Sequence, residues 1–249
     1  MRVSADPSER RLKSAIDDLR HLSPTLYWKS RNIAALIEWL WRRYRPSGGP
    51  GDAEVYDERF WTIREEGDWI GFASLVVHHF APRSIIDVGC GSGLALGAFR
   101  RVDPTLTLLG IECSGAGLRR AQTRGLRVER VDLAAARGPA LRELSSRLEG
   151  FDLALCLEVA EHLPPWRAGR LVRLLTRCQT VIFSAAHPNQ GGTLHLNEQP
   201  AEYWTRRFAA HGFPLHDRNG LFQHELAAID LPWWYAANAN VFHRVEPRH

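Results

Sequence analysis

The sequence lacks any apolar run that approaches the roughly 18 residues of a membrane-spanning helix. Its first residues, MRVSADPSERRLKSAIDDLR, are also too polar for a secretory signal peptide, so we expect a cytoplasmic protein without membrane contact. Cysteine is scarce. Cys90, Cys113, Cys156 and Cys178 are scattered and form no CxxC pair, so we expect reduced thiols and no disulfide framework.

Lysine is also rare, and the basic residues are almost all arginines spread along the chain. The formal net charge is +4, but no lysine tract or recognisable RNA-binding module accompanies it. We therefore interpret the arginines as a solvated surface and regard nucleic acid as an unlikely partner, with a phosphate-binding track as the alternative. The fractions of hydrophobic residues, 45%, and charged residues, 24%, are ordinary for a globular chain of 249 residues.

The N-terminal part differs in its pattern from the rest of the chain. Residues 8–45 favour helix, because Ile33, Leu36, Ile37 and Leu40 recur at helical spacing. The segment RPSGGPGD that follows is rich in proline and glycine and predicts a linker or hinge. We therefore divide the chain into an N-terminal helical extension or lid, residues 1–50, and a larger domain, residues 51–249.

From residue 84 onward, short apolar runs typical of strands alternate with helical patterns. Strands are expected at residues 84–88, 107–112, 126–133, 151–158 and 180–186, with helices near 94–101, 116–124 and 165–176. This alternation predicts an α/β fold with a doubly wound, mostly parallel sheet. Residues 213–219 and 238–245 could supply an antiparallel edge pair. In such sheets, ligands bind beyond the carboxyl ends of the strands.

Three glycines occupy every second position directly after the first expected strand, in SIIDVGCGSGLALGAF. Glycine weakens a strand, so Gly89, Gly91 and Gly93 indicate a backbone that must pass close to a ligand. The dinucleotide fingerprint GxGxxG is not met, because the next glycine is Gly97. The motif is instead DxGxGxG, beginning at Asp87.

This motif resembles motif I of the class I S-adenosylmethionine-dependent methyltransferases, and the resemblance extends from Ser84 to about His243. Glu112 follows the glycines by roughly 20 residues, where an acid accepts the ribose hydroxyls. Asp132 stands where this family uses a carboxylate for the adenine amino group, and CLEVAEHL is similar to its fourth motif. The resemblance implies a Rossmann-like class I methyltransferase fold and S-adenosyl-L-methionine as cofactor.

The resemblance also implies which residues contact the cofactor. They are Asp87, Gly89, Cys90, Gly91, Gly93, Glu112, Cys113, Asp132, Leu133 and Leu157. Asp87 would hydrogen-bond the glycine loop or the methionine amino group. Cys90, Cys113 and Cys156 are interpreted as small fillers of the cofactor cleft rather than as nucleophiles.

The expected reaction needs little from the protein, because the sulfonium already carries an activated methyl group. Alignment and a base for a hydroxyl acceptor suffice. His195 in HLNEQPAEYW is the expected base, with His162 and Glu158 as further catalytic candidates. The expected substrate-binding residues are Tyr56, Trp61, Glu161, His187, Trp204 and Trp234.

HLNEQPAEYW resembles the corresponding segment of methyltransferases found with sugar and natural-product biosynthesis enzymes. We therefore predict methyl transfer to a hydroxyl of a small molecule, a sugar or a secondary metabolite of the kind made in antibiotic biosynthesis. One alternative is a partner protein that binds the cofactor without catalysing a reaction. The sequence leaves open the acceptor, O- against N-methylation and the oligomeric state.

The E-x-x-E-H spacing of Glu158, Glu161 and His162 permits another interpretation. With His195, it resembles the metal site of small-RNA terminal 2′-O-methyltransferases and of metal-dependent O-methyltransferases of ubiquinone synthesis. Such oxygen and imidazole ligands could hold a divalent metal ion. No metal is favoured, because similar Glu-His pairs occur in this superfamily without one. Metal-assisted RNA 2′-O-methylation is the alternative function.

Overall fold

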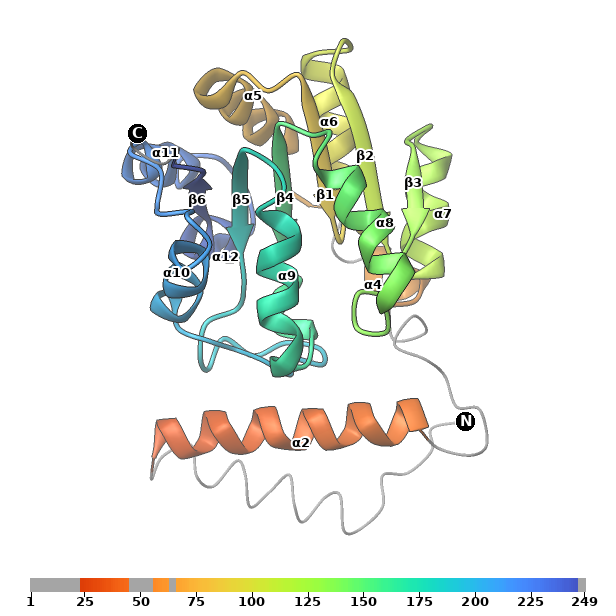
Figure 1. Cartoon of the computed structure of the whole chain (residues 1–249), viewed down its shortest axis with the longest axis vertical. Helices are drawn as coiled ribbons and strands as arrows, with labels where there is room; N and C mark the ends of the chain where they lie inside the picture. Colours follow the sequence, from red (N-terminus) through yellow and green to blue (C-terminus); the bar gives the residue numbers. More distant parts are fainter. Residues whose placement is uncertain (1–22, 45–55, 63–65, 246–249) are drawn as a thin grey trace.

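The computed structural model describes residues 23–44, 56–62 and 66–245 (Figure 1). The helices are α2 (Pro24–Tyr44), α4 (Glu58–Thr62), α5 (Trp69–Phe80), α6 (Leu94–Val102), α7 (Gly115–Thr123), α8 (Gly138–Leu148), α9 (Ala168–Leu175), α10 (Ala201–Ala209), α11 (Asn219–Leu226) and α12 (Trp233–Asn238). Two 3-10 helices are η1 (Ala160–His162) and η2 (Pro165–Arg167). The strands are β1 (Ser84–Val88), β2 (Thr107–Glu112), β3 (Val128–Arg130), β4 (Leu153–Leu157), β5 (Thr180–Ser184) and β6 (Asn240–His243).

The strands form one sheet in the order β3-β2-β1-β4-β5-β6. The first five strands pair in parallel, and β6 runs antiparallel to β5, with Val241 opposite Ile182. The strand order reverses between β1 and β4, because the chain first builds outward to β3 and then crosses back. This confirms the doubly wound sheet with an antiparallel edge strand and places the switch point of the sheet beside β1.

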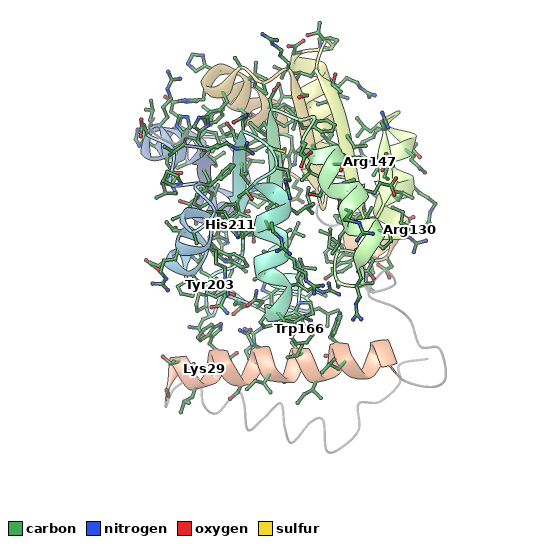
Figure 2. The ribbon with its side chains drawn as sticks, viewed as in Figure 1. Lys29, Arg130, Arg147, Trp166, Tyr203 and His211 are labelled. Carbon is green, nitrogen blue, oxygen red and sulfur yellow. The ribbon has the colours of Figure 1, made fainter. Side chains whose placement is uncertain are left out.

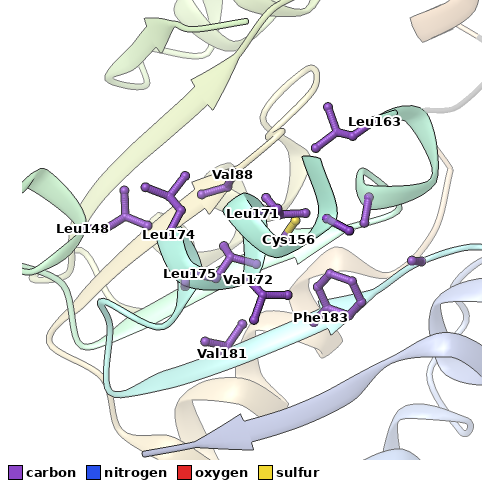
Figure 3. Packing of buried hydrophobic residues seen from close by; sticks show 14 of the residues in the cluster. Val88, Leu148, Cys156, Leu163, Leu171, Val172, Leu174, Leu175, Val181 and Phe183 are labelled. Carbon is purple, nitrogen blue, oxygen red and sulfur yellow. The ribbon is translucent and has the colours of Figure 1, made fainter. Parts of the chain in front are cut away.

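Helices cover both faces of the sheet, because successive strand residues point to opposite sides. Val88 and Phe183 face the layer of α8, α9 and α10 (Figure 3). Ile85 and Ile182 face the layer of α5, α6 and α11. With both faces covered, β1 and β5 are buried along their whole length. Asp87 is the acidic exception in β1, at the end that leads to the glycine turn.

The structure differs from the expected elements mainly at the rim of the sheet. β3 is shorter than the expected residues 126–133, because it is an edge strand that pairs only with β2. The chain leaves the sheet before Asp132 and Leu133. Of the expected edge pair, only β6 forms, while Leu215 makes an isolated bridge to Phe242. The helices α8, α10 and α11 were not among the expected elements.

The helix α2 lies across the end of the molecule at which the loop from β5 to α10 runs (Figure 1). Its Trp39 is 3% exposed and makes an edge contact with Trp166, with ring centroids 6.3 Å apart. Figure 2 shows Trp166 on the side of the domain that faces α2. Of the helical residues expected at 8–45, residues 8–22 and 45 lie outside the described residues, as does the expected hinge. None of the described helices combines the length and the apolarity needed to cross a membrane.

Candidate active site

The turn after β1 consists of glycines in a backbone conformation that side chains rarely tolerate. Gly89, Gly91 and Gly93 have φ angles of 87°, 55° and 80°, which lie outside the main regions for other residues. A Cβ on Gly91 would lie 2.5 Å from the ring of Trp61, and one on Gly89 would clash with Val159. The turn therefore brings bare backbone to the carboxyl end of β1, as the sequence predicted.

Glu112 ends β2 and braces this turn. Its buried carboxylate accepts hydrogen bonds from the backbone N–H groups of Gly91 at 2.8 Å, Cys113 at 2.7 Å and Ser114 at 2.6 Å. Burial raises the pKa of Glu112, although these hydrogen bonds oppose the shift. Each carboxylate oxygen has two lone pairs. The side chain can therefore hold the turn and still accept a hydrogen bond from a ligand hydroxyl.

Asp87 lies directly before the glycine turn and is 4% exposed. Burial, and secondarily the Glu112 carboxylate, raise the pKa of Asp87 to about 7. A cation beside the carboxylate would favour the charged form and lower this pKa again. Asp87 is therefore suited to a cationic ligand group at the mouth of the turn.

A cavity of about 650 Å³ opens beyond the carboxyl ends of β1, β2 and β4, and its volume is typical of small-molecule sites. The glycine turn, the end of β2, η1 and the loop from β5 to α10 all contribute to its wall. Acidic residues of the wall are Glu66, Asp87, Glu112, Asp132, Glu158 and Glu161. Among the described residues that line the cavity, none is lysine or arginine. The wall therefore favours cationic or neutral groups.

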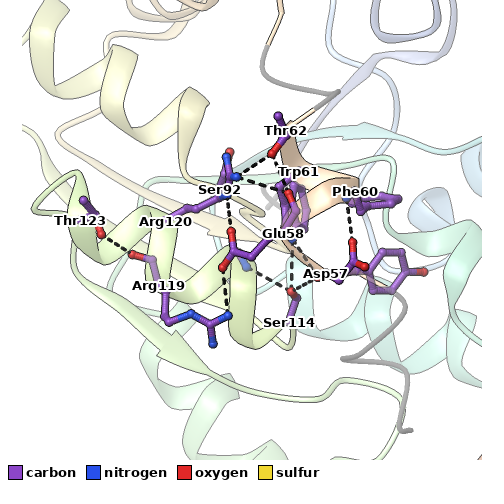
Figure 4. Close-up of polar contacts among 12 residues, drawn as sticks. Asp57, Glu58, Phe60, Trp61, Thr62, Ser92, Ser114, Arg119, Arg120 and Thr123 are labelled. Carbon is purple, nitrogen blue, oxygen red and sulfur yellow. Dashed lines mark hydrogen bonds and ion pairs between the residues drawn. The ribbon is translucent and has the colours of Figure 1, made fainter.

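The short helix α4 is fastened to α7 beside the glycine turn (Figure 4). The Glu58 carboxylate pairs with Arg119 at 2.9 Å and with Arg120 at 2.8 Å. The Ser114 hydroxyl donates a hydrogen bond to the carbonyl oxygen of Tyr56 at 2.6 Å. These contacts hold the aromatic segment around α4 against the cavity that the glycine turn borders.

Two histidines meet in the cavity wall, His162 of η1 and His195 of the loop after β5, with ring centroids 5.0 Å apart. Nδ1 of His195 lies 3.0 Å from the Glu198 carboxylate, and Nδ1 of His162 lies 3.3 Å from the Leu194 carbonyl oxygen. An ionised carboxylate only accepts hydrogen bonds, so the Glu198 contact favours a proton on Nδ1 of His195. Nδ1 of His162 also lies 3.1 Å from the Tyr56 hydroxyl, which can either donate or accept. The His195 ring then presents the lone pair of Nε2 as a base or a metal ligand.

Glu161 stands beside the two histidines. It is fully buried, and neither carboxylate oxygen has a hydrogen-bond partner among the described residues. One possible ligand atom each from Glu161, His162 and His195 lies within 4.8 Å of the others. Burial, and then the nearby Glu158 carboxylate, raise the pKa of Glu161 well above its usual range. An unpaired buried anion is costly, so Glu161 requires either a proton or a cation.

Glu158 lies next to this cluster and is held by two amides. Its carboxylate accepts hydrogen bonds from Nε2 of Gln190 and Nδ2 of Asn238, both at 3.1 Å. Asn238 also donates to the side-chain oxygen of Gln190 at 2.9 Å. The network ties the end of β4 to α12 and to the loop after β5. Glu158 thus contacts the loop through Gln190, and its expected catalytic role stays a prediction.

Most residues expected at the site line the cavity. They are Asp87, Gly89, Cys90, Gly91, Glu112, Cys113, Asp132, Leu133 and Leu157 from the cofactor set, and Tyr56, Trp61, Glu158, Glu161, His162, His195 and Trp234 from the catalytic and substrate sets. Gly93 caps α6 behind the turn, and His187 lies outside the wall.

Trp204 is 3% exposed and packs in the core, with its ring centroid 5.0 Å from that of Phe183. The expected substrate role of Trp204 is corrected, because the apolar face of α10 directs it to the sheet.

Several residues of the site were not singled out by sequence. Trp39 reaches the cavity wall from α2, but its sequence signal is that of any apolar helix residue. Gln190 and Glu198 flank His195 in one loop. The sequence singled out His195 in this loop, without showing which side chains contact it.

Comparison with known proteins agrees with this geometry. Residues 86–181 match a family model described as a methyltransferase domain. A curated relative, the ubiquinone biosynthesis O-methyltransferase of Alkalilimnicola ehrlichii, is 36% identical over 110 residues, which are 43% of this chain and 43% of the relative. The similarity thus spans less than half of that relative's length.

Two solved structures share the fold at low sequence identity. The sugar N-methyltransferase KedS8 from Streptoalloteichus has a TM-score of 0.53 and 17% identity, with 76% of this chain and 92% of that chain covered. The plantazolicin methyltransferase BpumL in complex with SAH has a TM-score of 0.51 and 14% identity, with 94% and 100% covered. Over residues 86–181 the chain therefore carries a methyltransferase domain, and its fold is that of the class I methyltransferases. In a fold of this kind, the cavity lies where ligands bind, beyond the carboxyl ends of the parallel strands.

Proposed function

We propose that this methyltransferase transfers the methyl group of S-adenosylmethionine to a hydroxyl of a small molecule without phosphate groups. The observation that carries the proposal is one cavity that joins the glycine turn, the histidine pair with an accepting Nε2 on His195, and a wall without described lysine or arginine side chains. The aligned segment of the curated O-methyltransferase supports oxygen as the methylated atom.

Three acids of the cavity are assigned to the cofactor. Asp87 accepts from the cationic amino group, Glu112 accepts from the ribose hydroxyls, and Asp132 accepts from the adenine amino group. Their charges suit a ligand that carries an ammonium and a sulfonium, because opposite charges attract strongly at a buried site. The cofactor supplies an activated methyl group when bound. The chain has to place this group in line with the acceptor oxygen.

His195 is assigned as the base that receives the acceptor's proton. Because Nδ1 is directed at Glu198, the incoming proton goes to Nε2, and the Glu198 carboxylate then stabilises the imidazolium. Nε2 of His195 would hold this proton while the acceptor oxygen receives the methyl group that the bound cofactor supplies. His162 is the second candidate, since it lies beside His195 in the same wall.

The charge of the wall argues for a small molecule over RNA. Proteins that bind RNA or DNA contact the phosphates largely through arginine and lysine, and the described wall offers acids instead. The same wall includes Trp69, Trp233, Trp234 and Tyr235. Their ring faces can stack on a sugar or an aromatic acceptor. A hydroxylated ring without phosphate therefore fits the cavity better than a nucleotide.

Labelled cofactor tests this proposal even while the acceptor is unidentified. Purified protein is incubated with isotope-labelled S-adenosylmethionine and separate small-molecule, RNA and protein fractions of a bacterial extract. We expect label in the small-molecule fraction, at a carbon whose chemical shift identifies an O-methyl group. The His195→Ala protein serves as the matched control. Label confined to RNA or protein, or found only on nitrogen, would overturn the proposal.

Metal-assisted O-methylation is the second candidate, and the unpartnered carboxylate of Glu161 favours it. Glu161, His162 and His195 offer one oxygen and two nitrogens, a donor set that suits a divalent ion. Such an ion would acidify and orient the acceptor hydroxyl. In that case His195 binds metal through Nε2 and cannot also be the base, so the two mechanisms exclude each other.

Cobalt(II) binding separates these mechanisms without an activity assay. If the three side chains form a metal site, cobalt should give a visible absorption spectrum that Glu161→Gln abolishes. The exposed acid Glu202 provides the control Glu202→Gln, which should leave the spectrum intact. Identical spectra in the wild type and Glu161→Gln, or no spectrum at all, would exclude the metal site and leave His195 as the base.

A further inference from the structure

Glu198 lies behind His195, on the side away from the cavity, and is 1% exposed. One carboxylate oxygen faces Nδ1 of His195 at 3.0 Å and accepts from the backbone N–H of Gly191 at 3.0 Å. The other oxygen accepts from the backbone N–H of Asn189 at 3.0 Å. One buried carboxylate thus fixes the backbone of the loop and the ring of His195 together.

The N-terminal helix α2 contacts the same residue from the opposite side, although 170 residues separate Trp28 from Glu198. The Trp28 indole N–H donates to the Glu198 carbonyl oxygen at 3.1 Å, and the Asn32 amide donates to it at 3.4 Å. The Arg31 guanidinium lies 3.9 Å from the Glu198 carboxylate. Glu198 is therefore the point at which α2 is joined to the loop that carries His195.

The negative Glu198 and the positive Arg31 bring opposite charges together where α2 meets the loop of His195. Burial by itself raises the pKa of Glu198, but the hydrogen bond and charge of His195, followed by Arg31, outweigh it and leave the pKa lowered. An ionised carboxylate here accepts from Nδ1 of His195 and directs Nε2 to the other side of the ring. A carboxylate that orients a histidine in this way is a common support for catalytic and metal-binding histidines.

We propose that Glu198 is the positioning residue of His195 and that α2, through Arg31, Trp28 and Asn32, is part of this positioning device. The proposal rests on the proposed role of His195 as base or metal ligand. It assigns the N-terminal helix a place in the catalytic unit: α2 holds Glu198, Glu198 holds one tautomer of His195, and that tautomer presents Nε2 to the acceptor. No contact with the acceptor is required of Glu198 or Arg31.

The tautomer of His195 can be read directly by NMR of isotope-labelled imidazole nitrogens, with the signal assigned by its loss in His195→Gln. In the wild type we expect a single tautomer with the proton on Nδ1. In Glu198→Gln the charge is lost and the amide has only one accepting atom for three donors, so both tautomers should be populated. Glu202→Gln on the exposed start of α10 is the matched control and should keep the single tautomer.

Arg31 tests the contribution of α2. Arg31→Met should populate the second tautomer to a smaller degree, Arg31→Lys should restore the wild-type spectrum, and Lys29→Met on the exposed side of α2 should have no effect. Affinity for SAH should change little in any of these proteins, which shows that the cofactor end of the site remains folded. If Glu198→Gln does not fold, Glu198→Asp replaces it.

The outcomes are separable. A single, unchanged tautomer in folded Glu198→Gln would overturn the positioning role, and an unchanged spectrum in Arg31→Met would overturn the part of α2. If Glu198→Gln loses SAH binding together with the single tautomer of His195, Glu198 has only a structural role. That result would also overturn the proposal. Because no acceptor is needed, label found only in RNA, in protein or on nitrogen would refute the proposed function without deciding this result.

Discussion

Asp87 and Glu112 show how single residues link the fold to the ligand. Both carboxyls are buried at the carboxyl ends of central strands, where burial raises their pKa values. Glu112 is supported by three backbone N–H groups, whereas Asp87 lies beside another acid. Asp87 therefore gains more than Glu112 from a cationic ligand, because such a ligand supplies the missing opposite charge.

Asp87 should make cofactor binding depend on pH. Its pKa of about 7 in the free protein means that it is partly protonated at pH 6.5. Binding of the cationic amino group of SAH should expel that proton, so affinity should rise with pH up to about 7. Calorimetry in two buffers with different ionisation heats measures the released proton. Asp87→Asn should abolish the release and weaken binding by about 1.5–3 kcal/mol, the value of a hydrogen bond to a charged group.

Asp132→Asn is the control for this measurement, because it removes the proposed adenine contact and leaves Asp87 in place. It should bind SAH more weakly and still release the proton. Wild-type binding without proton release at pH 6.5 would show that Asp87 does not face the cation of the ligand.

Replacing His195 distinguishes a role as catalytic base from a role as loop anchor. As a base, it should give a reduction in single-turnover rate of roughly 10²- to 10⁴-fold in His195→Ala, while affinity for SAH stays unchanged. The reduction is expected because Nε2 would no longer receive the proton of the acceptor. An unchanged rate with weakened acceptor binding would make His195 an anchor and leave His162 as the remaining base. The assay uses the acceptor identified by isotope labelling.

At the scale of elements, the contact between α4 and the glycine turn determines the shape of the cofactor mouth. Trp61 packs against Gly91, and its indole N–H lies 3.2 Å from Ser114 Oγ at the start of α7. The ion pairs of Glu58 with α7 are exposed and contribute little stability by themselves. The position of α4 therefore depends mainly on the fit of the Trp61 ring over bare glycine backbone.

Gly91→Ala should disturb SAH binding through Trp61. The added Cβ would lie 2.5 Å from the ring, and the φ of 55° adds strain of about 1 kcal/mol or more. In the background of Trp61→Ala the clash disappears and only the strain remains. A double-mutant cycle on SAH affinity should therefore show a coupling energy of about 0.5–3 kcal/mol.

The control for this cycle is Gly97→Ala in α6, because nothing lies within 4 Å of the position that the added methyl group would take, and alanine favours helix. SAH affinity should be unchanged in Gly97→Ala. Additive effects of Gly91→Ala and Trp61→Ala would contradict the inferred contact.

The sequence pattern predicted the central strands. It did not predict the contacts between segments that lie far apart in the chain. β1, β2 and the start of β5 lie at the expected residues, because buried parallel strands require continuous apolar runs. Trp204 and His187, which follow the fifth strand in sequence, were expected at the substrate, but α10 turns Trp204 into the core and His187 lies outside the cavity wall. The partners of Glu198 could not be predicted, since Trp28 and Arg31 approach it from the far end of the chain.

For the molecule as a whole, the site concentrates buried acid at one end of a well-packed sheet. Phe183 and Val181 on one face and Ile182 on the other leave β5 no contact with solvent. This rigid layer can support costly groups at its carboxyl edge, such as the unpartnered carboxylate of Glu161. Active sites commonly carry strained or poorly compensated groups that the remainder of the fold stabilises. We therefore expect the buried acids to lower the free energy of unfolding of the ligand-free protein.

The stability of the ligand-free protein should consequently fall as the pH rises from about 5 to 8. Burial raises the pKa values of Asp87, Glu112, Glu158 and Glu161, so the folded state holds protons that the unfolded state releases above its ordinary pKa near 4. Stability from such groups is present at low pH and is lost as pH rises toward the folded pKa. For Asp87, which titrates at about 7, the loss is on the order of 4 kcal/mol. Urea unfolding at several pH values should show this slope, and Asp87→Asn should reduce it. Saturating SAH should also reduce the slope of stability against pH, because a cation then lies beside the Asp87 carboxylate. A stability that rises with pH over this range would contradict the burial of these acids.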